Sequence, residues 1–520
     1  MDRDSTSGNE GAWPAVGRLS ARCRPLFAWE MVIELPADTT DAGVTCADTS
    51  PAGEEEPPLS EADAERLIRA ICFKTGPPGT IGAELEWLVR DGADPLLPVE
   101  FSRIREVFEH LGKPGALPGA GLLTFEPGGQ VELSTAPAKD LSECVAAASG
   151  DLAVLHEAFG DAGLVLTGHG IDPLRRPNRV LDLPRYAAME EYFDRDGHWG
   201  RVMMCSTASV QVCVDAGLDD DGISGFPFRW RLLHALGPVL VAAFANSPLR
   251  RGQPTGWKCT RQLVWARLNP GRTRSPGGAE PFQPDGRTGQ DGLDVREHWA
   301  RYALDAEVLC VRRADGQPWS VPTDLTFRDW LRGAGGPRAQ SDAGPLAKAG
   351  PTADDLSYHL STLFPPVRPR GHLELRMIDA QHGDRWVVPV AVVAALADDP
   401  LAADAAMTAA EPVWHGHGTR QRPAADSSGK PAARQLPRPR AGSVDGASPW
   451  LRAASLGLAD PALARAARQC FEAAEEALAR SGTPAAVRNA VADFAERYVQ
   501  RGKCPADDVL DAIGNQKGQT

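Results

Sequence analysis

The chain has 520 residues, of which 42% are hydrophobic and 24% charged, and its formal net charge is −14. These values are typical of a globular protein with one large core or two or three smaller ones, and the acidic balance argues against a general nucleic-acid-binding protein, whose surface is basic. No run of about 18 apolar residues occurs, so no membrane span is predicted.

The cysteines and the N-terminus bear on the cellular compartment. The ten cysteines show neither a CxxC pair nor a zinc-ligand spacing, and the N-terminus lacks the basic and then apolar pattern of a secretory signal. Reduced core thiols fit this pattern, and a cytoplasmic location is therefore expected. The cysteines in apolar or patterned segments are Cys72, Cys205, Cys213, Cys259 and Cys310.

Composition divides the chain into four segments. Residues 1–57 are rich in Asp, Glu, Ser, Thr, Gly and Pro and are predicted to form a disordered extension. Residues 58–411 carry the patterned helices and strands of a main domain. Residues 412–448, rich in Pro, Gly, Arg and Ser, are predicted to be a flexible insertion. Residues 449–520 are predicted to be a helical segment that packs on the main domain.

The main domain is expected to open with a helix over residues 60–72, with Ser60 as its N-cap. The run 81–89 then alternates apolar and polar residues, which predicts a β-strand with Glu84 and Glu86 on one face. Same-face neighbours on a strand lie roughly 6–7 Å apart. Two carboxylates at that distance on a half-buried face repel each other unless cations bridge them.

Two further strand segments are predicted at residues 122–126 and 130–134, joined by a turn or bulged bend at Pro127–Gly129. Glu126 ends the first segment, and Glu132 lies on the polar face of the second, with Gln130 and Ser134.

Two later strands carry polar residues in the same way. In the run 208–215, Ser209, Gln211 and Asp215 lie opposite the valines. In the run 372–378, a carboxylate and a guanidinium share one face, which is costly unless something charged meets them. An internal Glu–Arg ion pair that holds the sheet is an equally good interpretation of this strand taken alone. Its apolar Leu373, Leu375 and Met377 alternate with His372, Glu374, Arg376 and Ile378.

A strand is also predicted over residues 262–267, with Arg261 at its head. Residues 269–293, which include Arg272, are rich in Gly, Pro and Arg and are predicted to be a long loop; such loops are often lids or ligand loops. A short strand is expected at 164–166. Helices are predicted at 100–112, 140–160, 187–193, 227–246, 295–306, 326–333, 352–364, 388–397, 461–480 and 484–501, the last with Thr483 as N-cap and Pro484 as first residue.

Five carboxylates thus stand on predicted strands, and they converge if those strands share one sheet. Such a cluster would cost many kcal/mol at low dielectric unless cations neutralise it. Magnesium prefers carboxylates and substrate phosphates as ligands, and Arg376 nearby suits a phosphoryl group. The face is therefore predicted to bind a magnesium–nucleotide triphosphate. In the alternative, the strands lie in different sheets and each glutamate is simply solvated.

Several other nucleotide-binding and catalytic motifs are absent. There is no G-x-x-x-x-G-K-[ST] loop and no kinase glycine-rich loop with its lysine strand. No G-x-S-x-G elbow occurs. The motifs that are present resemble the glutamate–cysteine ligase family of the plant and actinobacterial kind, and most of all its actinobacterial branch, whose members begin ergothioneine biosynthesis. The resemblance covers about residues 59–411, and within it the string Phe-Glu-Pro-Gly-Gly-Gln-x-Glu is specific. The segments that carry it, in this order, are Gly82–Glu86, Thr124–Ser134, Ser209–Val212, Phe244–Pro248 and Leu373–Arg376.

The resemblance implies an α+β fold similar to glutamine synthetase: a curved, mostly antiparallel sheet that forms a funnel, with helices outside, plus C-terminal helices. It makes residues 58–411 a catalytic ATP-dependent ligase domain. It also implies the reaction, in which ATP phosphorylates the γ-carboxylate of L-glutamate and the amine of L-cysteine then displaces phosphate. Positioning and charge neutralisation are the main needs of phosphoryl transfer, so the absence of a nucleophile triad fits.

The resemblance further implies roles for individual residues. Arg376 and Glu374 would be catalytic, at the transferred phosphoryl group. Gln211 would lie by the nucleotide, Arg272 near phosphate, and Arg261 at the α-carboxylate of glutamate; for both Arg261 and Arg272, a merely solvated arginine is an open alternative. The Mg²⁺ ligands would be Glu84, Glu86, Glu126, Glu132 and Glu374. Two other functions stay open: a ligase that joins glutamate to another amine, and a non-catalytic nucleotide- or metal-binding regulator with the same fold.

Overall fold

The computed structural model describes residues 58–517, apart from 112, 114, 277–293, 314–315, 334–349 and 416–447. All the described residues belong to one compact unit, which spans Gly53–Thr520. The predicted disordered extension 1–57 lies outside the described residues, as does most of the predicted insertion. The predicted domain boundary at residue 411 falls inside helix α14, which continues to His415.

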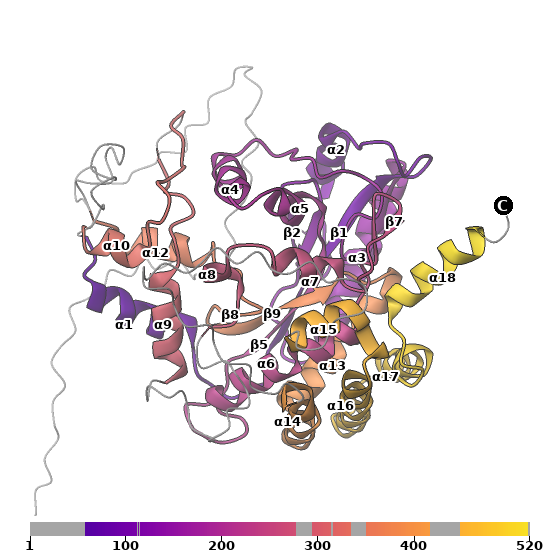
Figure 1. Cartoon of the computed structure of the whole chain (residues 1–520). Helices are drawn as coiled ribbons and strands as arrows, with labels where there is room; N and C mark the ends of the chain where they lie inside the picture. The colour runs from indigo at the N-terminus through magenta and orange to yellow at the C-terminus, as the bar shows by residue number, and fades with distance from the viewer. Residues whose placement is uncertain are drawn as a thin grey trace, which may run out of the picture. The chain divides into compact units, whose positions relative to one another are not determined.

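A seven-stranded sheet unites the strands that carry the polar residues (Figure 1). Its order is β2-β3-β1-β5-β9-β8, with β4 paired to the far end of β1, and every strand pair is antiparallel. The expected α+β fold with an antiparallel sheet is thus confirmed. The strands are β1 (Ile81–Asp91), β2 (Leu122–Phe125), β3 (Val131–Ser134), β4 (Leu164–Thr167), β5 (Ser209–Asp215), β8 (Val367–Pro369) and β9 (His372–Asp379), and a separate hairpin pairs β6 (Leu249–Arg250) with β7 (Gln253–Pro254).

The register of β1 explains why the carboxylates meet. Glu84 lies opposite Gln211 of β5, and Glu86 lies opposite Glu132 of β3. Directly opposed residues of antiparallel strands point to the same face. The strands therefore share one sheet, and the alternative of separate sheets with solvated glutamates is wrong.

A bulge interrupts the pairing of β5 with β9. Val212 pairs with Leu375 and Val210 with Ile378, so β9 holds one residue more than β5 across this interval. The extra residue shifts the alternation of side chains. Ile378 consequently points to the same side as Leu375, and the expectation that it shares a face with Glu374 is wrong.

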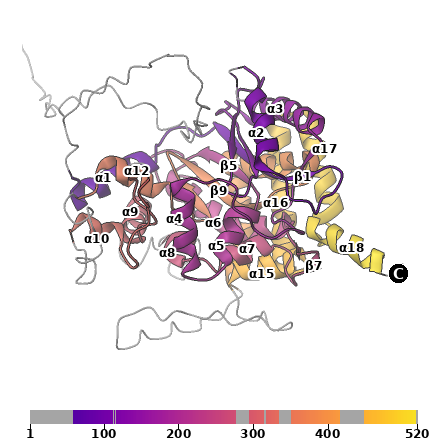
Figure 2. The same ribbon diagram turned by 90° about the horizontal axis from the view of Figure 1, so that it is seen from above.

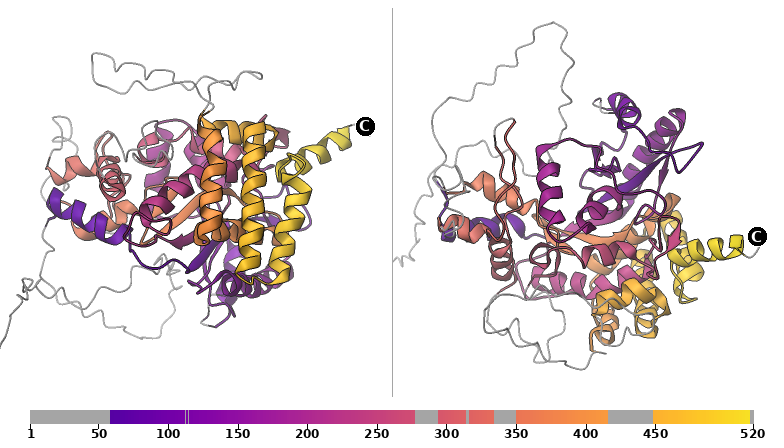
Figure 3. Two further views of the ribbon diagram at one scale, coloured as in Figure 1. Left: turned by 90° about the horizontal axis from the view of Figure 1, so that it is seen from below. Right: turned by 45° about the horizontal axis from the view of Figure 1, so that its top comes forward.

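Apolar helices cover the other face of the sheet. Helices α3 (Leu141–Asp161), α6 (Phe226–Ala243) and α13 (Val387–Asp398) pack directly on the strands, and α13 is buried from Val387 to Ala397. The C-terminal helices then pack on α6 and α13, with α14, α16 and α17 side by side (Figure 3). This outer layer consists of α14 (Pro400–His415), α15 (Pro449–Leu456), α16 (Pro461–Arg480) and α17 (Ala485–Phe494).

A second group of helices, α1, α9, α10 and α12, gathers at one end of the sheet (Figures 1 and 2). The ring of His359 links α12 to α9 and α10, because its Nε2 lies 2.8 Å from the carbonyl of Ala303 and the ring stacks on Phe327 with the centroids 4.7 Å apart. In the described part of the chain, the α-helices whose bounds have not yet been given are α1 (Glu61–Cys72), α2 (Phe101–Leu111), α4 (Pro184–Asp194), α5 (Trp199–Ser206), α7 (Thr260–Trp265), α8 (Pro270–Thr273), α9 (Val295–Asp305), α10 (Phe327–Leu331), α12 (Ala353–Leu360) and α18 (Pro505–Lys517).

The segment 262–267, predicted as a strand, is helical as far as Trp265 and then forms a turn. Cys259 caps α7, because its sulfur accepts a hydrogen bond from the backbone of Gln262 at 3.4 Å. A parallel bridge from Ser247 to Cys259 fixes where the helix begins. The Leu-Val-Trp run has a high strand propensity, but these contacts with distant residues outweigh it, because strand propensity depends strongly on context. The predicted loop 269–293 likewise begins with the helical turn α8.

Two smaller expectations also need correction. The N-cap of α17 is Pro484 and not Thr483, and the helix passes into a π-helical turn over Ala495–Val499. The eight described cysteines are free, in keeping with reduced thiols, but Cys205 and Cys213 are only partly buried. Among the described helices none is by itself long and apolar enough to cross a membrane; only α13 with its preceding turn, taken with α14, passes that test, and this pair is bent by 103°.

Candidate active site

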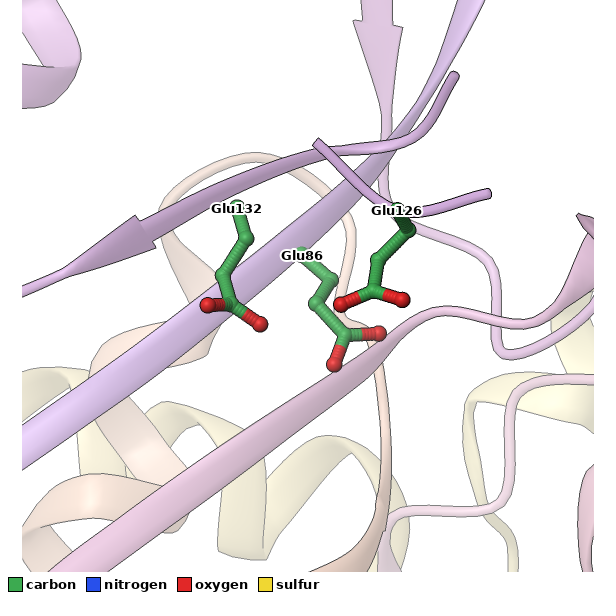
Figure 4. Close-up of side chains that lie close together, drawn as sticks. All are labelled: Glu86, Glu126 and Glu132. Carbon is green, nitrogen blue, oxygen red and sulfur yellow. The ribbon is translucent and has the colours of Figure 1, made fainter. Parts of the chain in front are cut away.

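Three carboxylates meet on the sheet face opposite the apolar helices (Figure 4). Glu86 comes from β1, Glu132 from β3 and Glu126 from the turn that follows β2. One oxygen of each lies within 4.8 Å of the others. Like charges directly opposite on a sheet are destabilising, so this group of three, here called the acidic triad, calls for a neutralising partner.

The turn after β2 places Glu126. The amide of Glu126 donates to the carbonyl of Gln130 at 2.9 Å, and Gly129 adopts a positive φ of 82°. Gly128 packs so closely on the backbone of Cys205 that a Cβ would lie 2.4 Å from its carbonyl oxygen. The geometry therefore favours glycine at positions 128 and 129, and the predicted turn is confirmed.

Burial and the charges of neighbouring carboxylates raise the pKa values of Glu126 and Glu132 in the acidic triad, and that of the nearby Glu84. Burial and then Glu86 raise the pKa of Glu126 to about 7. Burial and then Glu84 raise the pKa of Glu132 well above its usual value. Burial, followed by Glu374, raises the pKa of Glu84 to about 7. Carboxylates whose ionisation is unfavourable without a nearby positive charge, and which offer only oxygen atoms as donors, fit a hard divalent cation such as Mg²⁺.

Hydrogen bonds hold two triad members in place. Ser209 donates to Glu86 from its backbone and its hydroxyl, both at 2.9 Å, and Gln211 Nε2 donates to the same carboxylate at 2.9 Å. Thr124 Oγ1 donates to Glu132 at 3.0 Å. These donors fix the orientation of each carboxylate, as outer groups do for metal ligands.

Gln211 links the acidic triad to Arg376. Its amide nitrogen donates to Glu86, while its oxygen accepts a hydrogen bond from Arg376 Nη1. Nε of Arg376 is buried and has no hydrogen-bond partner among the described residues. The two predicted residues thus lie together beside the carboxylates.

Glu374 has different partners from the acidic triad. Its oxygens accept hydrogen bonds from Arg368 at 2.8 and 3.0 Å, and one also accepts from Arg376. Burial opposes its ionisation, but Arg368 and Arg376 hold the pKa of Glu374 below its usual value. The ion-pair interpretation of this strand is therefore the observed one, and the prediction that Glu374 is a metal ligand gains no support from its contacts.

Two arginines near the site were not predicted. Arg368 lies opposite Glu374 in the β8–β9 pairing, and a short Arg-Pro-Arg-Gly turn before the strand was the available signal. Arg185, in the first turn of α4, lies over the ring of Tyr358 at 5.0 Å and donates to Ser361 Oγ at 3.2 Å. Its charge partly offsets the rise that burial causes in the pKa of Glu126.

Arg261 is drawn into the site by α7. Its side chain is buried, and Nη2 donates to the carbonyl of Arg376 at 2.9 Å. Nε and Nη1 have no hydrogen-bond partner in the described part of the chain. Buried donors of a guanidinium are normally paired; that a carboxylate of glutamate pairs with these two atoms stays a prediction.

Arg272 is used differently. Its guanidinium donates to the carbonyls of Thr362 and Glu307, and to Thr362 Oγ1 at 3.2 Å, and it lies over the ring of Tyr192 at 4.8 Å. These contacts tie α4 and α8 to neighbouring loops. They give no support to the predicted phosphate contact, which stays a prediction.

Comparisons with known proteins show which family the chain resembles. The model of glutamate–cysteine ligase family 2 matches residues 80–520. Glutamate–cysteine ligase EgtA of Mycobacterium tuberculosis is 38% identical over 457 residues, 87% of this chain and 90% of the relative. EgtA of Mycolicibacterium smegmatis is 37% identical over 456 residues, 87% of this chain and 92% of the relative.

A plant relative is more distant. The chloroplastic glutamate–cysteine ligase A of Oryza sativa subsp. japonica is 29% identical over 407 residues, 74% of this chain and 76% of the relative. The match of the family model to most of the chain, together with the two mycobacterial relatives, establishes kinship. The chain therefore belongs to glutamate–cysteine ligase family 2.

Proposed function

We propose that the protein is an ATP-dependent glutamate–cysteine ligase that forms γ-glutamylcysteine from L-glutamate and L-cysteine, as the first step of ergothioneine biosynthesis. The observation that carries this proposal is the acidic triad joined through Gln211 to Arg376. Relatives named glutamate–cysteine ligase EgtA, which match most of the chain, support the two amino-acid substrates, and the pathway rests on the resemblance seen in the sequence. A cytoplasmic location and the absence of a nucleic-acid partner remain predictions from the sequence.

The reaction has two steps. An oxygen of the glutamate γ-carboxylate attacks the terminal phosphorus of ATP, and ADP leaves. The amine nitrogen of cysteine then attacks the carbonyl of the γ-glutamyl phosphate, the amine loses a proton, and phosphate leaves. Both steps gather negative charge on phosphoryl oxygens, so preorganised donors are the main catalytic need.

Glu86, Glu126 and Glu132 would hold Mg²⁺, which supplies positive charge to the phosphates of ATP when bound. That Glu84 is a further ligand stays a prediction, because it lies outside the acidic triad. Burial and then the charge of Glu374 raise its pKa. Arg376 would donate to the transferred phosphoryl group. Arg261 would receive a carboxylate of glutamate on its two unpartnered donors.

The test is a phosphate-release assay on the purified protein with ATP, glutamate and a panel of amines, with the product identified by mass. Release should need glutamate, cysteine and magnesium together. Glu126→Gln should abolish most of it, whereas Glu109→Gln, an exposed glutamate of α2, should not.

Each alternative has its own outcome in this assay. If glycine or 2-aminobutyrate clearly outruns cysteine, the protein is a ligase for another amine. ATP binding without turnover on any amine would identify a non-catalytic regulator. Phosphate release that persists in excess chelator would contradict the metal site.

A further inference from the structure

A buried carboxylate, Asp379, lies behind Arg261 at the end of β9. It is opposite Ser209 in the sheet, and its side chain is 1% exposed. Because Ser209 contacts Glu86, this register places Asp379 on the face of the acidic triad. The sequence pattern gave no indication of it, since strict alternation would send Asp379 to the opposite face.

Both oxygens of Asp379 bind the chain that leads into α7. Oδ2 accepts hydrogen bonds from the backbone of Asn246 at 2.9 Å and from Ser247 Oγ at 2.7 Å. Oδ1 lies 3.3 Å from Cys259 Sγ, which donates to it. The carboxylate thus clamps two segments that flank the start of the helix.

These same groups hold the first turn of α7. Ser247 Oγ accepts a hydrogen bond from the backbone of Arg261 at 3.2 Å while donating to Asp379. The backbone of Thr260 donates to the carbonyl of Ser247 at 3.1 Å. A helix of six residues is too short to be stable alone, so the direction of Arg261 depends on this anchor.

The space and the charge around Asp379 favour a carboxylate at this position. A Cβ on Gly170 would lie 2.2 Å from its Cγ, so only glycine leaves room for the carboxylate. Burial raises the pKa of Asp379, and the nearby charge of Arg261 counters that rise. Asp379 therefore fixes the backbone that carries Arg261 and places a negative charge near its guanidinium. Two donors of that guanidinium still have no hydrogen-bond partner among the described residues.

We propose that Asp379 is a positioning residue, which fixes the start of α7 so that Nε and Nη1 of Arg261 can receive a carboxylate of the substrate glutamate. The inference rests on the proposed function. A purely structural role for Asp379 is the alternative, and it predicts a loss of stability without any selective loss of glutamate affinity.

The experiment compares Asp379→Asn with wild-type protein and with Asp151→Asn as the matched control. Asp151 is equally buried and accepts hydrogen bonds from the backbones of Gly119 and Gly121, well separated in sequence from α7. Asparagine keeps the shape of the side chain but replaces one acceptor by a donor. Michaelis constants, turnover, melting temperature and glutamate binding by calorimetry are measured on each.

Asp379→Asn should raise both the Michaelis constant and the dissociation constant for glutamate about tenfold, equivalent to about 1.4 kcal/mol, with the Michaelis constant for ATP within about twofold. Asp151→Asn should lower only the melting temperature. Glutamate binding unchanged in Asp379→Asn would overturn the inference. If that variant does not fold, Ser247→Ala decides, since unchanged glutamate affinity there has the same meaning. Wild-type protein that neither binds nor uses glutamate would instead refute the proposed function.

Discussion

Arg368 and Glu374 form a two-pronged ion pair between β8 and β9, with Nη2 at 2.8 Å from Oε1 and Nε at 3.0 Å from Oε2. Both side chains are almost completely buried, at 1% and 0% exposure. Arg376 binds the same carboxylate. Because two arginines pair with it, the Glu374 carboxylate is fixed in place, and it holds the guanidinium of Arg376 beside the acidic triad.

Replacing Arg368 by methionine should destabilise the protein by about 3–5 kcal/mol, because it leaves a buried carboxylate with one of its two cationic partners. Urea unfolding followed by circular dichroism measures the change. Arg332→Met removes an exposed arginine paired with Glu61, and it should leave the unfolding midpoint nearly unchanged. Equal shifts for the two variants would contradict the assigned importance of the Arg368–Glu374 pair.

Arg376→Lys should lower turnover by roughly 10²–10³, the scale of losing one preorganised donor, with a smaller change in the Michaelis constant for ATP. Lysine keeps the charge but lacks the planar guanidinium, which can donate hydrogen bonds to Glu374, Gln211 and a phosphoryl group at the same time. Steady-state kinetics and melting temperature on the same preparation test this. Arg385→Lys, at an arginine bound to the hydroxyl of Tyr498, is the control. A lowered melting temperature with normal turnover would show that Arg376 is only an ion-pair partner.

Metal-free protein should lose stability as the pH rises from about 4.5 to about 7. The pKa values of Glu84 and Glu126 are raised to about 7, above the 4.5 of a free glutamate. Folded protein therefore holds these protons more tightly than unfolded protein, and the stability they contribute is lost as they dissociate. Magnesium should raise the melting temperature more at pH 8 than at pH 5.5, since it binds ionised carboxylates.

Thermal melts with and without magnesium at both pH values provide the measurement. Glu126→Gln removes one of the titrating groups, so its metal-free melting temperature should fall less with rising pH, and magnesium should stabilise it less. Equal stabilisation by magnesium at the two pH values would argue against the acidic triad as the metal site.

Removal of residues 1–57, or of residues 416–447, should leave turnover within a few-fold. Both segments lack the apolar content to build a core. The second deletion needs a short Gly/Ser linker between His415, which ends α14, and Ser448, which caps α15. Product formation by each folded variant is the measurement, and a hundredfold loss would show that the deleted segment reaches the active site.

The sequence was informative where a local pattern decides the geometry. The alternation around Glu84 and Glu86 predicts a strand by itself, and the Pro-Gly-Gly turn predicts how Glu126 returns toward Glu132. Convergence of the carboxylates needed only the further assumption that these strands share a sheet. The strand and the turn depend on neighbours in the sequence, and the structure confirms both. Of the five carboxylates, the structure brings Glu86, Glu126 and Glu132 within 4.8 Å of one another.

The remainder depends on contacts between distant segments. The pairing of Arg368 with Glu374 follows from hairpin register, which alternation alone does not determine. Arg185 reaches the site from a helix whose position no local pattern reports. The predicted strand 262–267 is replaced by α7, which runs to Trp265, because Ser247 and Asp379 bind the start of this helix and override the strand propensity of its side chains.

The bulge in β9 has a consequence for the tolerance of this strand to length changes. Glu374 before it and Asp379 after it are five residues apart, and they face the same way only because the bulge accommodates one extra residue. Deleting a single residue between Leu375 and Ile378 would complete the ladder and leave these two side chains four residues apart, still on one face. A strand of the present length that paired without the bulge would instead turn every later side chain over, and Asp379 would leave Arg261. The strand should therefore tolerate the loss of the bulged residue, whereas straightening it at its present length would separate the proposed phosphoryl end of the active site from its proposed glutamate end.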